Sequence, residues 1–508
     1  MRKCYFLLSV LGVCLLMLSA QSAKAMQAAG STLTYANIGP NLYFVQYTFY
    51  RDCSGYAAAT TETLRYNAPG CATAGTLTLQ RNSQTVGNPY CSSVPVTCNS
   101  VNSAAPNHEE HVYSGVVSLP QACPNWTFSV RTAFRNNSRN LINGNTQWLY
   151  TEAFLNSVAA PDNSSPQFIE NIKPYLLVNR KHRILYRAAD ADGDSIIYSL
   201  TSALTDTNTA VSYFSGFSAT TPFGPNANPD VSLNAASGMV EVMPTDFNAT
   251  VTILAGLNKY VVAVQADEYR NINNQWVKIG HVRHDAVYMV IDGVADQLPY
   301  LGQLLFNGNP VQYDSVLEVE VGQTLRLQTS AQDPNAGDTL YLSTNFEQLV
   351  PVTSGSPGYS FSVSAGARPT ATLTWTPTQS HVRDRPYYFE FKVQENACPL
   401  KAYYYETVGI RVKAAGATTG VKEDLAKKYK LQTLLTPNGD GIQDRLILAP
   451  ELEGAALQIY SRDGRLIKSY HRYDNSWAAT DAGAGLYFYQ LSHTQSNQVI
   501  TGKILVVK

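Results

Sequence analysis

The sequence predicts an all-β protein that consists of tandem β-sandwich domains. Apolar and polar residues alternate over residues 315–331, so that every second residue from Leu317 to Val321 faces the same side of the expected strand. A nearly continuous apolar run at 260–266 is typical of a strand buried in a sandwich. Clusters of Gly, Pro, Asn and Asp separate such runs at short spacing, and residues 421–430 carry the one helical pattern.

The composition sets limits on both organisation and function. A chain of 508 residues exceeds what a single hydrophobic core holds, so several domains are expected. Hydrophobic residues make up 44%, which argues against disorder, whereas charged residues make up only 15%, which fits an extracellular β protein better than a cytosolic enzyme. The net charge is −1 and no basic stripe is present, so nucleic acid is not an expected partner.

Residues 1–25 have the pattern of a signal peptide. Two basic residues begin the segment, an apolar run follows at 4–18, and small residues at Ala23 and Ala25 place the expected cleavage after Ala25. The run is too short to span a membrane, and lipid attachment at Cys14 is disfavoured because the run continues past it. We therefore expect an exported protein that is soluble or attached to a surface, and not one that spans the membrane.

The cysteines that remain after cleavage are expected to form disulfides, because an exported chain meets an oxidising compartment. Six cysteines allow 15 pairings, and the sequence does not choose among them. Five lie in the first region and one lies far away, so at least one of the five pairs across domains, pairs with another chain or stays free. No CxxC pair is present, which disfavours zinc. The candidates are Cys53, Cys71, Cys91, Cys98, Cys123 and Cys398.

Residues 26–160 are expected to form a disulfide-bonded N-terminal β domain, with a typical strand at 42–50. His108 and His111 suggest a metal-binding HExxH motif, but they are three residues apart instead of four, and a strand would place them on opposite faces. No GxSxG elbow occurs either. We therefore predict that the protein is not an enzyme, and the alternative is an extracellular hydrolase with this module catalytic.

The middle of the chain contains two copies of one pattern, at 161–294 and 295–414. Asp190 corresponds to Asp333 and Asp194 to Asp338, with one residue inserted in the second copy. Each copy has an Asp-rich turn, then a YSL-like strand, then a strand that reads WTPT in the second copy and EVMPT in the first. This pattern resembles Ig-like or cadherin-like extracellular repeats, which implies two β-sandwich domains.

The Asp-rich turns are candidate calcium sites. Carboxylates that lie close together repel one another unless a cation lies between them. Calcium takes six to eight oxygen ligands, so a distant acid such as Asp267 or Glu268 would have to contribute. The alternative is a solvated turn in which Asp and Asn bond their own backbone. The candidate ligands are Asp190, Asp192 and Asp194 in the first copy and Asp333, Asn335 and Asp338 in the second.

A linker is expected at 415–430 and a last module at 431–508. The last module contains, in sequence order, TPNGDGIQD at 436–444, a hairpin signal RDG at 462–464 and two strand-like runs near the terminus. They resemble the gliding-motility-associated C-terminal domain, the type B sorting domain of type IX secretion. Gln443 departs from the family, which usually has Asn there. The motif residues are Thr436, Pro437, Asn438, Gly439, Asp440, Gly441 and Asp444.

The first of these pieces, residues 436–444, has two further interpretations. Its Asn and Asp oxygens could bind calcium, but we expect a glycine-assisted turn in which these side chains bond their own backbone. A phosphate-binding loop is disfavoured because no GK[ST] follows. As a sorting domain, this module is expected to be a small β-sandwich.

The resemblance implies export to the periplasm and then recognition by an outer-membrane machine, so that the protein ends on the cell surface or outside the cell. The expected function is adhesion or a gliding-associated surface interaction, without catalysis. The expected partners are the type IX machinery and an unknown surface glycan or protein, and calcium is the one candidate cofactor. A passive surface spacer is a further alternative.

Overall fold

The computed structural model describes most of the chain after residue 26. The described residues are 27–87, 90–98, 106–168, 175–224, 231–249, 258–292, 296–350, 358–383, 385–398, 400–414, 429, 431–461, 466–480, 482–493 and 498–507. The expected signal peptide at 1–25 and the expected helix and linker at 415–430 lie almost wholly outside them. Within the described residues, no helix is long and apolar enough to cross a membrane.

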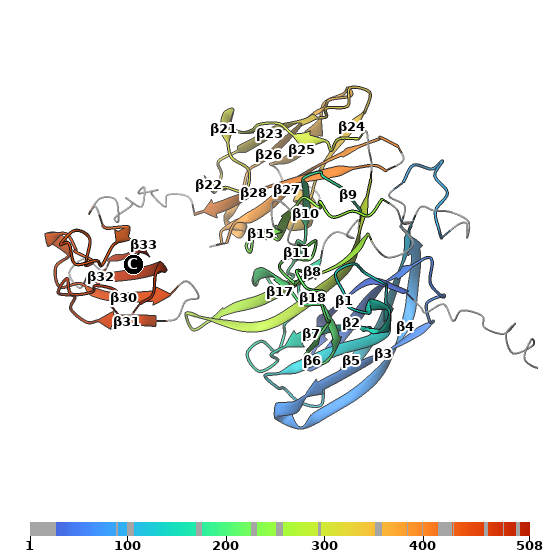
Figure 1. Cartoon of the computed structure of the whole chain (residues 1–508), viewed down its shortest axis with the longest axis horizontal. Coiled ribbons are helices and arrows are strands. Elements are labelled where there is room, and N and C mark those ends of the chain that lie inside the picture. The colour runs from blue at the N-terminus through green and yellow to red at the C-terminus, as the bar shows by residue number, and fades with distance from the viewer. Residues whose placement is uncertain are drawn as a thin grey trace, which may run out of the picture. The chain divides into compact units, whose positions relative to one another are not determined.

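The chain forms two compact units, Met1–Ala415 and Gly416–Lys508. The prediction of an all-β protein is confirmed (Figure 1). In the described part of the chain, α-helix is confined to the four residues of α2 (Phe346–Leu349).

The first unit begins with seven strands that form one continuous sheet. β1 pairs with β2, and the order continues through β5, β4 and β3 to β6 and β7. The start of β1 also pairs in parallel with the end of β6, so the sheet curls back on itself around an aromatic core that includes Tyr35 and Phe128. The strands are β1 (Gln27–Gly39), β2 (Leu42–Asp52), β3 (Thr61–Ala68), β4 (Thr73–Val86), β5 (His108–Ser118), β6 (Trp126–Arg135) and β7 (Trp148–Leu155).

A long hairpin from the expected first repeat joins this sheet. β17 (Lys259–Ile272) pairs with β18 (Gln275–Ile291), and β18 also pairs with β1 and β7. The boundary expected at residue 160 therefore does not separate two cores, because hydrogen-bonded ladders and buried side chains from both segments are continuous across it. The apolar run at the start of β17 is buried on both faces, as expected for a central strand.

Shorter strands complete this part of the unit. β12 (Ser195–Thr201) pairs with β17, and β10 (His182–Leu185), β16 (Met239–Val242) and β15 (Ser232–Leu233) form a three-stranded sheet. The remaining short strands are β8 (Gln167–Phe168), β9 (Tyr175–Leu177), β11 (Ala188–Ala189), β13 (Leu204–Asp206) and β14 (Thr209–Ala210).

The expected second repeat is a β-sandwich within the same unit. One sheet contains β19 (Tyr300–Leu301), β20 (Leu304–Phe306), β21 (Asn309–Val311), β23 (Leu325–Gln332), β25 (Tyr359–Val363) and β26 (Thr370–Trp375). The other contains β22 (Val316–Glu320), β24 (Leu340–Thr344), β27 (Tyr387–Glu395) and β28 (Tyr403–Lys413). Trp375, Phe346 and Phe389 pack between the two sheets. The pairing of β24 with β27 repeats the pairing of β12 with β17.

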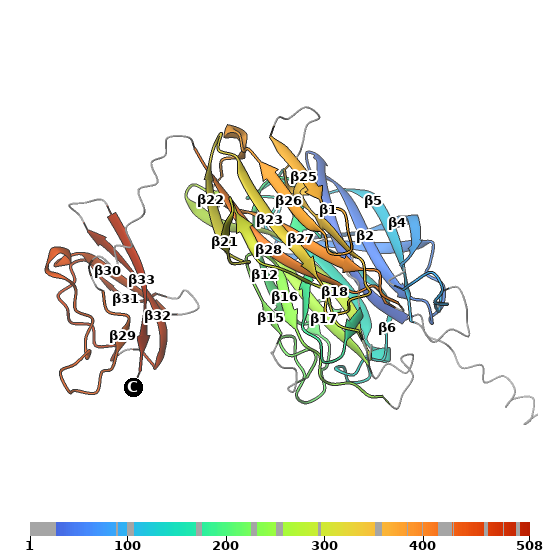
Figure 2. The same cartoon turned by 90° about the horizontal axis from the view of Figure 1, so that it is seen from above.

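The second unit contains a five-stranded sheet in the order β29-β33-β32-β30-β31. Figure 2 shows the strands of this unit from above. Its strands are β29 (Leu434–Leu435), β30 (Ala456–Ser461), β31 (Leu466–Tyr470), β32 (Gly485–His493) and β33 (Gln498–Val506). Leu446, Tyr473 and Trp477 lie outside the described strands and belong to the same core as Ile459 and Ile504. Loop segments thus contribute to the core of this unit together with the sheet. The expected RDG turn lies outside the described residues, but the two strands around it pair antiparallel.

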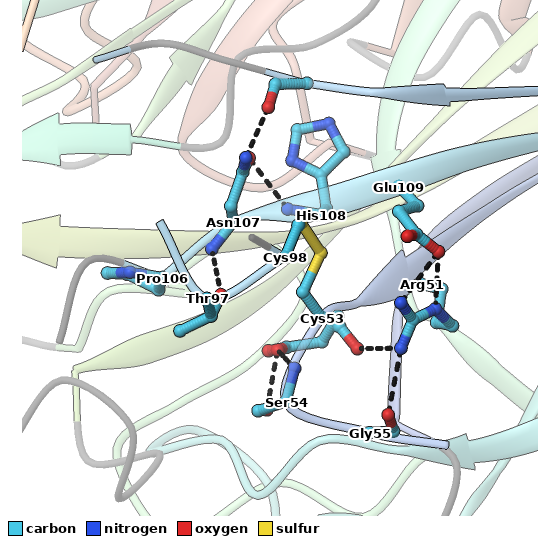
Figure 3. Close-up of a disulfide and its surroundings, with 12 residues drawn as sticks. Arg51, Cys53, Ser54, Gly55, Thr97, Cys98, Pro106, Asn107, His108 and Glu109 are labelled. Atoms are coloured by element: carbon cyan, nitrogen blue, oxygen red, sulfur yellow. Dashed lines mark hydrogen bonds and ion pairs between the residues drawn. A yellow bond between two sulfur atoms is a disulfide. The ribbon is translucent and has the colours of Figure 1, made fainter. Parts of the chain in front are cut away.

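All six candidate cysteines form disulfides, all within the first unit. Cys53 pairs with Cys98 and Cys71 with Cys123, and the first of these lies beside the ion pair of Arg51 and Glu109 (Figure 3). Cys91 pairs with Cys398 across 307 residues of sequence. Of the three fates expected for the fifth cysteine of the first region, the structure therefore shows pairing across expected domains. Such bridges stabilise a fold mainly because they restrict the unfolded chain.

Candidate functional site

The Asp-rich turn of the first repeat lies between β11 and β12, above an acid of β17. Asp190, Asp192 and Asp194 occupy the turn, and Gly193 adopts a φ of 80°, which favours glycine. Glu268 pairs in register with Ile196, two residues past Asp194. One oxygen from each of the four carboxylates lies within 4.8 Å of all the others. The structure therefore brings together the three turn residues expected from the sequence and Glu268, one of the two distant acids considered there.

Asp190 and Glu268 form the inner side of this group, and each has one carboxylate oxygen without a hydrogen-bond donor. Glu268 is fully buried; its Oε2 accepts a bond of 2.7 Å from Asn163, but its Oε1 has no partner. The Oδ1 atom of Asp190 accepts bonds from the N–H groups of Asp192 and Asp194, whereas its buried Oδ2 has no partner. Burial, together with the neighbouring Asp190, raises the pKa of Glu268 well above its usual range. A proton or a cation between the two side chains would relieve this cost.

The backbone of β18 is fitted closely to the Glu268 carboxylate. Gly280 pairs with Glu268 in the ladder, and a β-carbon at this position would come within 2.2 Å of Oε2. Glycine is therefore required where the strand passes this side chain.

The outer two carboxylates already have a cation. The Arg270 side chain donates to Asp194 from Nε at 2.8 Å and from Nη2 at 2.5 Å, and its Nη2 lies 3.8 Å from Asp192. The positive charge of Arg270 thus neutralises part of the charge of Asp192 and Asp194, while Asp190 and Glu268 form no ion pair among the described residues. Asp267, the other acid considered from the sequence, instead pairs with Lys278 at 2.6 Å.

The second repeat contains a related cluster of Asp296, Asp338 and Glu395, whose oxygens also lie within 4.8 Å of one another. Glu395 pairs with Leu340, two residues past Asp338, and so occupies the same ladder position as Glu268. Its Oε1 accepts the N–H of Ala402 at 2.9 Å, and its buried Oε2 has no partner. Burial and Asp296 raise the pKa of Glu395 above its usual range.

The other two residues expected in this second site are not members of this group of three, although Asp333 lies beside Glu395 and contributes to its raised pKa. Asp333 has a buried Oδ2 without a partner, and its Oδ1 accepts the N–H of Asn335. The Asn335 side chain accepts the N–H of Gln297 at 3.0 Å. Sequence reasoning missed Glu395 and Asp296. The runs at 260–268 and 388–396 are similar in sequence when Asn396 is placed opposite Glu268, whereas the ladders show that Glu395 is the equivalent residue. An acid at the end of an otherwise buried strand was the available signal.

Both groups of residues fit a hard cation. All the donors are carboxylate oxygens, which calcium prefers, and calcium can bind carboxylates that would otherwise repel one another. Each cluster includes a buried carboxylate oxygen with no hydrogen-bond donor. Asp190, Glu268 and Asp192 would hold the ion in the first repeat, and Asp296, Asp338 and Glu395 in the second.

In the similar loop of the second unit, at 438–444, backbone N–H groups of the loop donate hydrogen bonds to its own acidic side chains. Asp444 accepts the N–H groups of Gly439 and Gly441 at 2.8 and 2.7 Å, and these bonds hold its pKa below the usual range. Asp440 accepts the N–H of Ile442 at 2.8 Å, and Asn438 accepts the N–H of Asp440 at 3.1 Å. This geometry is that of the expected glycine-assisted turn, with positive φ angles at both glycines.

His108 and His111 lie on β5 and are both buried. The Nε2 atom of His111 lies 3.1 Å from Glu109. Glu109 also pairs with Arg51 (Figure 3), and His108 packs against Tyr50. Burial lowers the pKa of His108 to about 4. In the described part of the chain, neither histidine belongs to a group of three or more potential metal ligands.

Comparison with known families gives one match in sequence. The model of the CHU_C Type IX secretion signal domain matches residues 429–506, which confirms the resemblance to a type IX sorting domain for this segment. No curated protein matches the chain significantly.

Solved structures that resemble this chain include several cadherin-like proteins. Drosophila N-cadherin EC1-4 is 10% identical, with 89% of this chain and 94% of that chain covered and a TM-score of 0.16. Mouse clustered PcdhgC3 EC1-3 is 14% identical, with coverages of 55% and 86% and a TM-score of 0.17. An endo-fucoidan hydrolase of glycoside hydrolase family 107 is 12% identical, with coverages of 66% and 39% and a TM-score of 0.14. Scores this low carry no argument about function.

Proposed function

We propose that this chain is a non-enzymatic protein that is exported by its C-terminal domain and acts in adhesion or in a gliding-associated interaction at the cell surface. The observation that carries the proposal is the match of residues 429–506 to a type IX secretion signal domain. A signal domain of this kind implies export to the cell surface or outside the cell, and contact with the type IX machinery.

The organisation of the chain supports this division of roles. The signal domain lies in the second compact unit, with a hydrophobic core of its own. The first unit carries all three disulfides, which suits an oxidising compartment. We propose that the first unit presents the interaction surface and that the second unit directs export.

Deletion of residues 431–508 tests the export role. We expect the truncated chain to accumulate in the periplasm, whereas the full chain reaches the surface or the medium, as measured by cell fractionation and protease accessibility. As a matched control, residues 416–508 are fused to a periplasmic reporter, which should then leave the cell. Normal surface display of the truncated chain would refute the proposal.

A binding screen beside a hydrolase assay tests the interaction role. The full chain is applied to arrays of glycans and surface proteins, and the same preparation is incubated with a broad set of polysaccharide and peptide substrates. Binding without turnover is expected. Turnover would favour the extracellular hydrolase, and neither binding nor turnover would favour a passive spacer.

We also propose that calcium stabilises the first unit at the two acid clusters. The observation that favours it is that Asp190 and Glu268, two members of one acid cluster, each keep a buried oxygen without a donor, Oδ2 and Oε1 respectively. A cation there would stabilise the turn that joins β11 to β12. Calcium titration with a chelator control tests this role.

A further inference from the structure

A cavity of about 550 Å³ lies within the first unit, between the first and second repeats. One wall comes from the segment around β11 and β12 and includes Arg187 and Tyr198. The opposite wall comes from β27, β28 and the residues before them, and includes Arg385, Tyr388 and Arg411. A volume of this size is typical of sites that hold a small organic ligand.

Positive charge dominates the lining. Four arginines contribute, namely Arg187, Arg383, Arg385 and Arg411. Two acids, Asp190 and Asp194, also line the cavity. The carboxylate of Asp194 is already paired with Arg270, and that of Asp190 faces Glu268 in the acid cluster. The acids therefore leave most of the guanidinium charge uncompensated.

Arg187 is the most informative of the four. It is buried, only 7% exposed, and its Nη1 atom has no hydrogen-bond partner. In the described part of the chain it forms no ion pair, and the negative charge of Glu390 offsets only part of the effect of burial on its pKa. Burial lowers the pKa of Arg187 to about 10, so the side chain is still a cation at neutral pH. A buried cation without an ion-pair partner is costly, and an anion in the cavity would reduce that cost.

The other three arginines are also poorly neutralised. Arg385 donates to the backbone oxygens of Asp194 and Ile196 at 3.0 and 3.3 Å, which bonds the guanidinium but leaves its charge. Arg383 stacks over the ring of Tyr387 at 3.5 Å. Arg411 has a buried Nε without a partner, and among the described residues it contacts an acid in an exposed pair with Glu318 at 3.5 Å. Guanidinium groups in this arrangement match the planar or tetrahedral oxygens of oxyanions.

We propose that this cavity binds an oxyanion, namely a carboxylate, sulfate or phosphate group carried by a ligand of about the size of a sugar unit. The guanidinium of Arg187 binds the anionic group, Arg385 and Arg411 flank it, and the ring of Tyr388 offers a face for the body of the ligand. This inference goes beyond the proposed function, because the cavity would bind such a ligand whether or not the protein acts in adhesion.

Isothermal titration calorimetry of the full chain, in a buffer free of oxyanions, tests the proposal. The probes are glucuronate, glucose 6-sulfate, inorganic sulfate, inorganic phosphate and neutral glucose. We expect at least one charged probe to bind and glucose not to bind. Arg187→Met should weaken that binding about tenfold or more, the cost of one charged hydrogen-bonded contact. If glucuronate or glucose 6-sulfate binds more tightly than the inorganic ions, the ligand is an anionic group carried by a sugar. If they bind equally, the ligand is the free anion.

Two further variants keep the test decisive. Arg326→Met removes an exposed arginine of the same unit, away from the cavity, and should leave the affinity within about twofold. If Arg187→Met fails to fold, as judged by its thermal unfolding, the exposed Arg383→Met takes its place. Absence of binding by every charged probe, or equal affinity in the wild type and the cavity variants, would overturn the proposal. Neither result would affect the export proposal, which the fractionation assay tests separately.

Discussion

Two acidic turns of this chain look alike in sequence but differ in structure. The turn at 190–194 and the loop at 438–444 both combine alternating acids or amides with glycine. In the loop of the second unit, the side chains of Asn438, Asp440 and Asp444 each accept N–H groups of the same loop, and the first two residues are exposed. In the turn of the first unit, Asp190 keeps a buried oxygen without a donor.

The difference between the two turns comes from the strand against which the Asp190 turn packs, and not from the residues of the turn. The Asp190 turn lies over β17, which places the fully buried Glu268 against it, and the Gly280 backbone passes close to that side chain. No acid cluster is found around Asp440 in the described residues. An acidic turn therefore becomes a candidate cation site only when a second, buried acid from a distant strand lacks a donor.

Removal of calcium should produce the largest contrast between the two units. At a concentration a hundredfold above its Kd, calcium adds about 2.7 kcal/mol per site to the unfolding free energy. We expect a chelator to lower the unfolding temperature of Met1–Ala415 and to leave that of Gly416–Lys508 unchanged, as measured by differential scanning calorimetry of the full chain. Equal shifts of the two transitions, or no shift in the first, would break the comparison.

Substitution of Glu268→Gln should remove most of the calcium effect of the first cluster. The amide keeps the shape of the side chain but loses the charge that holds the ion, so calcium affinity should fall at least about tenfold, which is about 1.4 kcal/mol. Without calcium, the variant should be at least as stable as the wild type, because two facing carboxylates become one.

Urea unfolding with and without calcium measures both effects of the Glu268 substitution. Asp440→Asn in the exposed loop is the matched control and should change neither. A Glu268→Gln chain that gains as much stability from calcium as the wild type would place the ion elsewhere.

The first unit also contains His284, a buried side chain without hydrogen-bond partners, and we therefore predict that acid destabilises this unit. His284 is buried among aromatic rings, and neither of its ring nitrogens has a partner. Burial lowers its pKa to about 3, from 6.5. The unfolded chain therefore takes up a proton below pH 6.5 that the folded chain refuses until about pH 3. The stability that this group contributes is complete above pH 6.5 and is lost as the pH falls.

His284→Phe should reduce the loss of stability between pH 6.5 and pH 4 by up to about 1.4 kcal/mol per pH unit. Urea unfolding at several pH values measures the slope for each chain, so a general loss of packing in the variant does not affect the result. The exposed His471→Phe in the second unit serves as the control. Identical slopes in the wild type and in His284→Phe would contradict the prediction.

Much of the local structure could be predicted from the sequence. The runs at 42–50 and 260–266 lie within β2 and β17, because a buried face leaves a regular apolar pattern. The run at 315–331 divides into β22 and β23, with Gly322 at a φ of 82° between them. A glycine within an alternating pattern was a signal for this break.

Long-range pairing could not be predicted in the same way. The pairing of β18 with β1 joins residues about 250 positions apart, and nothing in either strand specifies the partner. The same holds for Cys91 with Cys398, and for Glu395, whose role depends on its ladder position opposite Leu340. An apolar pattern states which face is buried but not what covers it, so the fold class was accessible while the complete acid clusters were not.

The smallest expected effect comes from Asp444→Ala in the second unit. The substitution removes the acceptor for the N–H groups of Gly439 and Gly441, so the loop loses its two bracing bonds and the second transition should move to a lower temperature. Since the pKa of Asp444 lies below its usual 3.8, its contribution is present above that pH and is lost as the pH falls further. The shift should therefore disappear in strong acid and be the same with and without calcium, as measured by calorimetry at both conditions, with the exposed Glu451→Ala as the control. A calcium-dependent shift in Asp444→Ala would show that this loop also holds a cation, and the distinction between the two turns would fail.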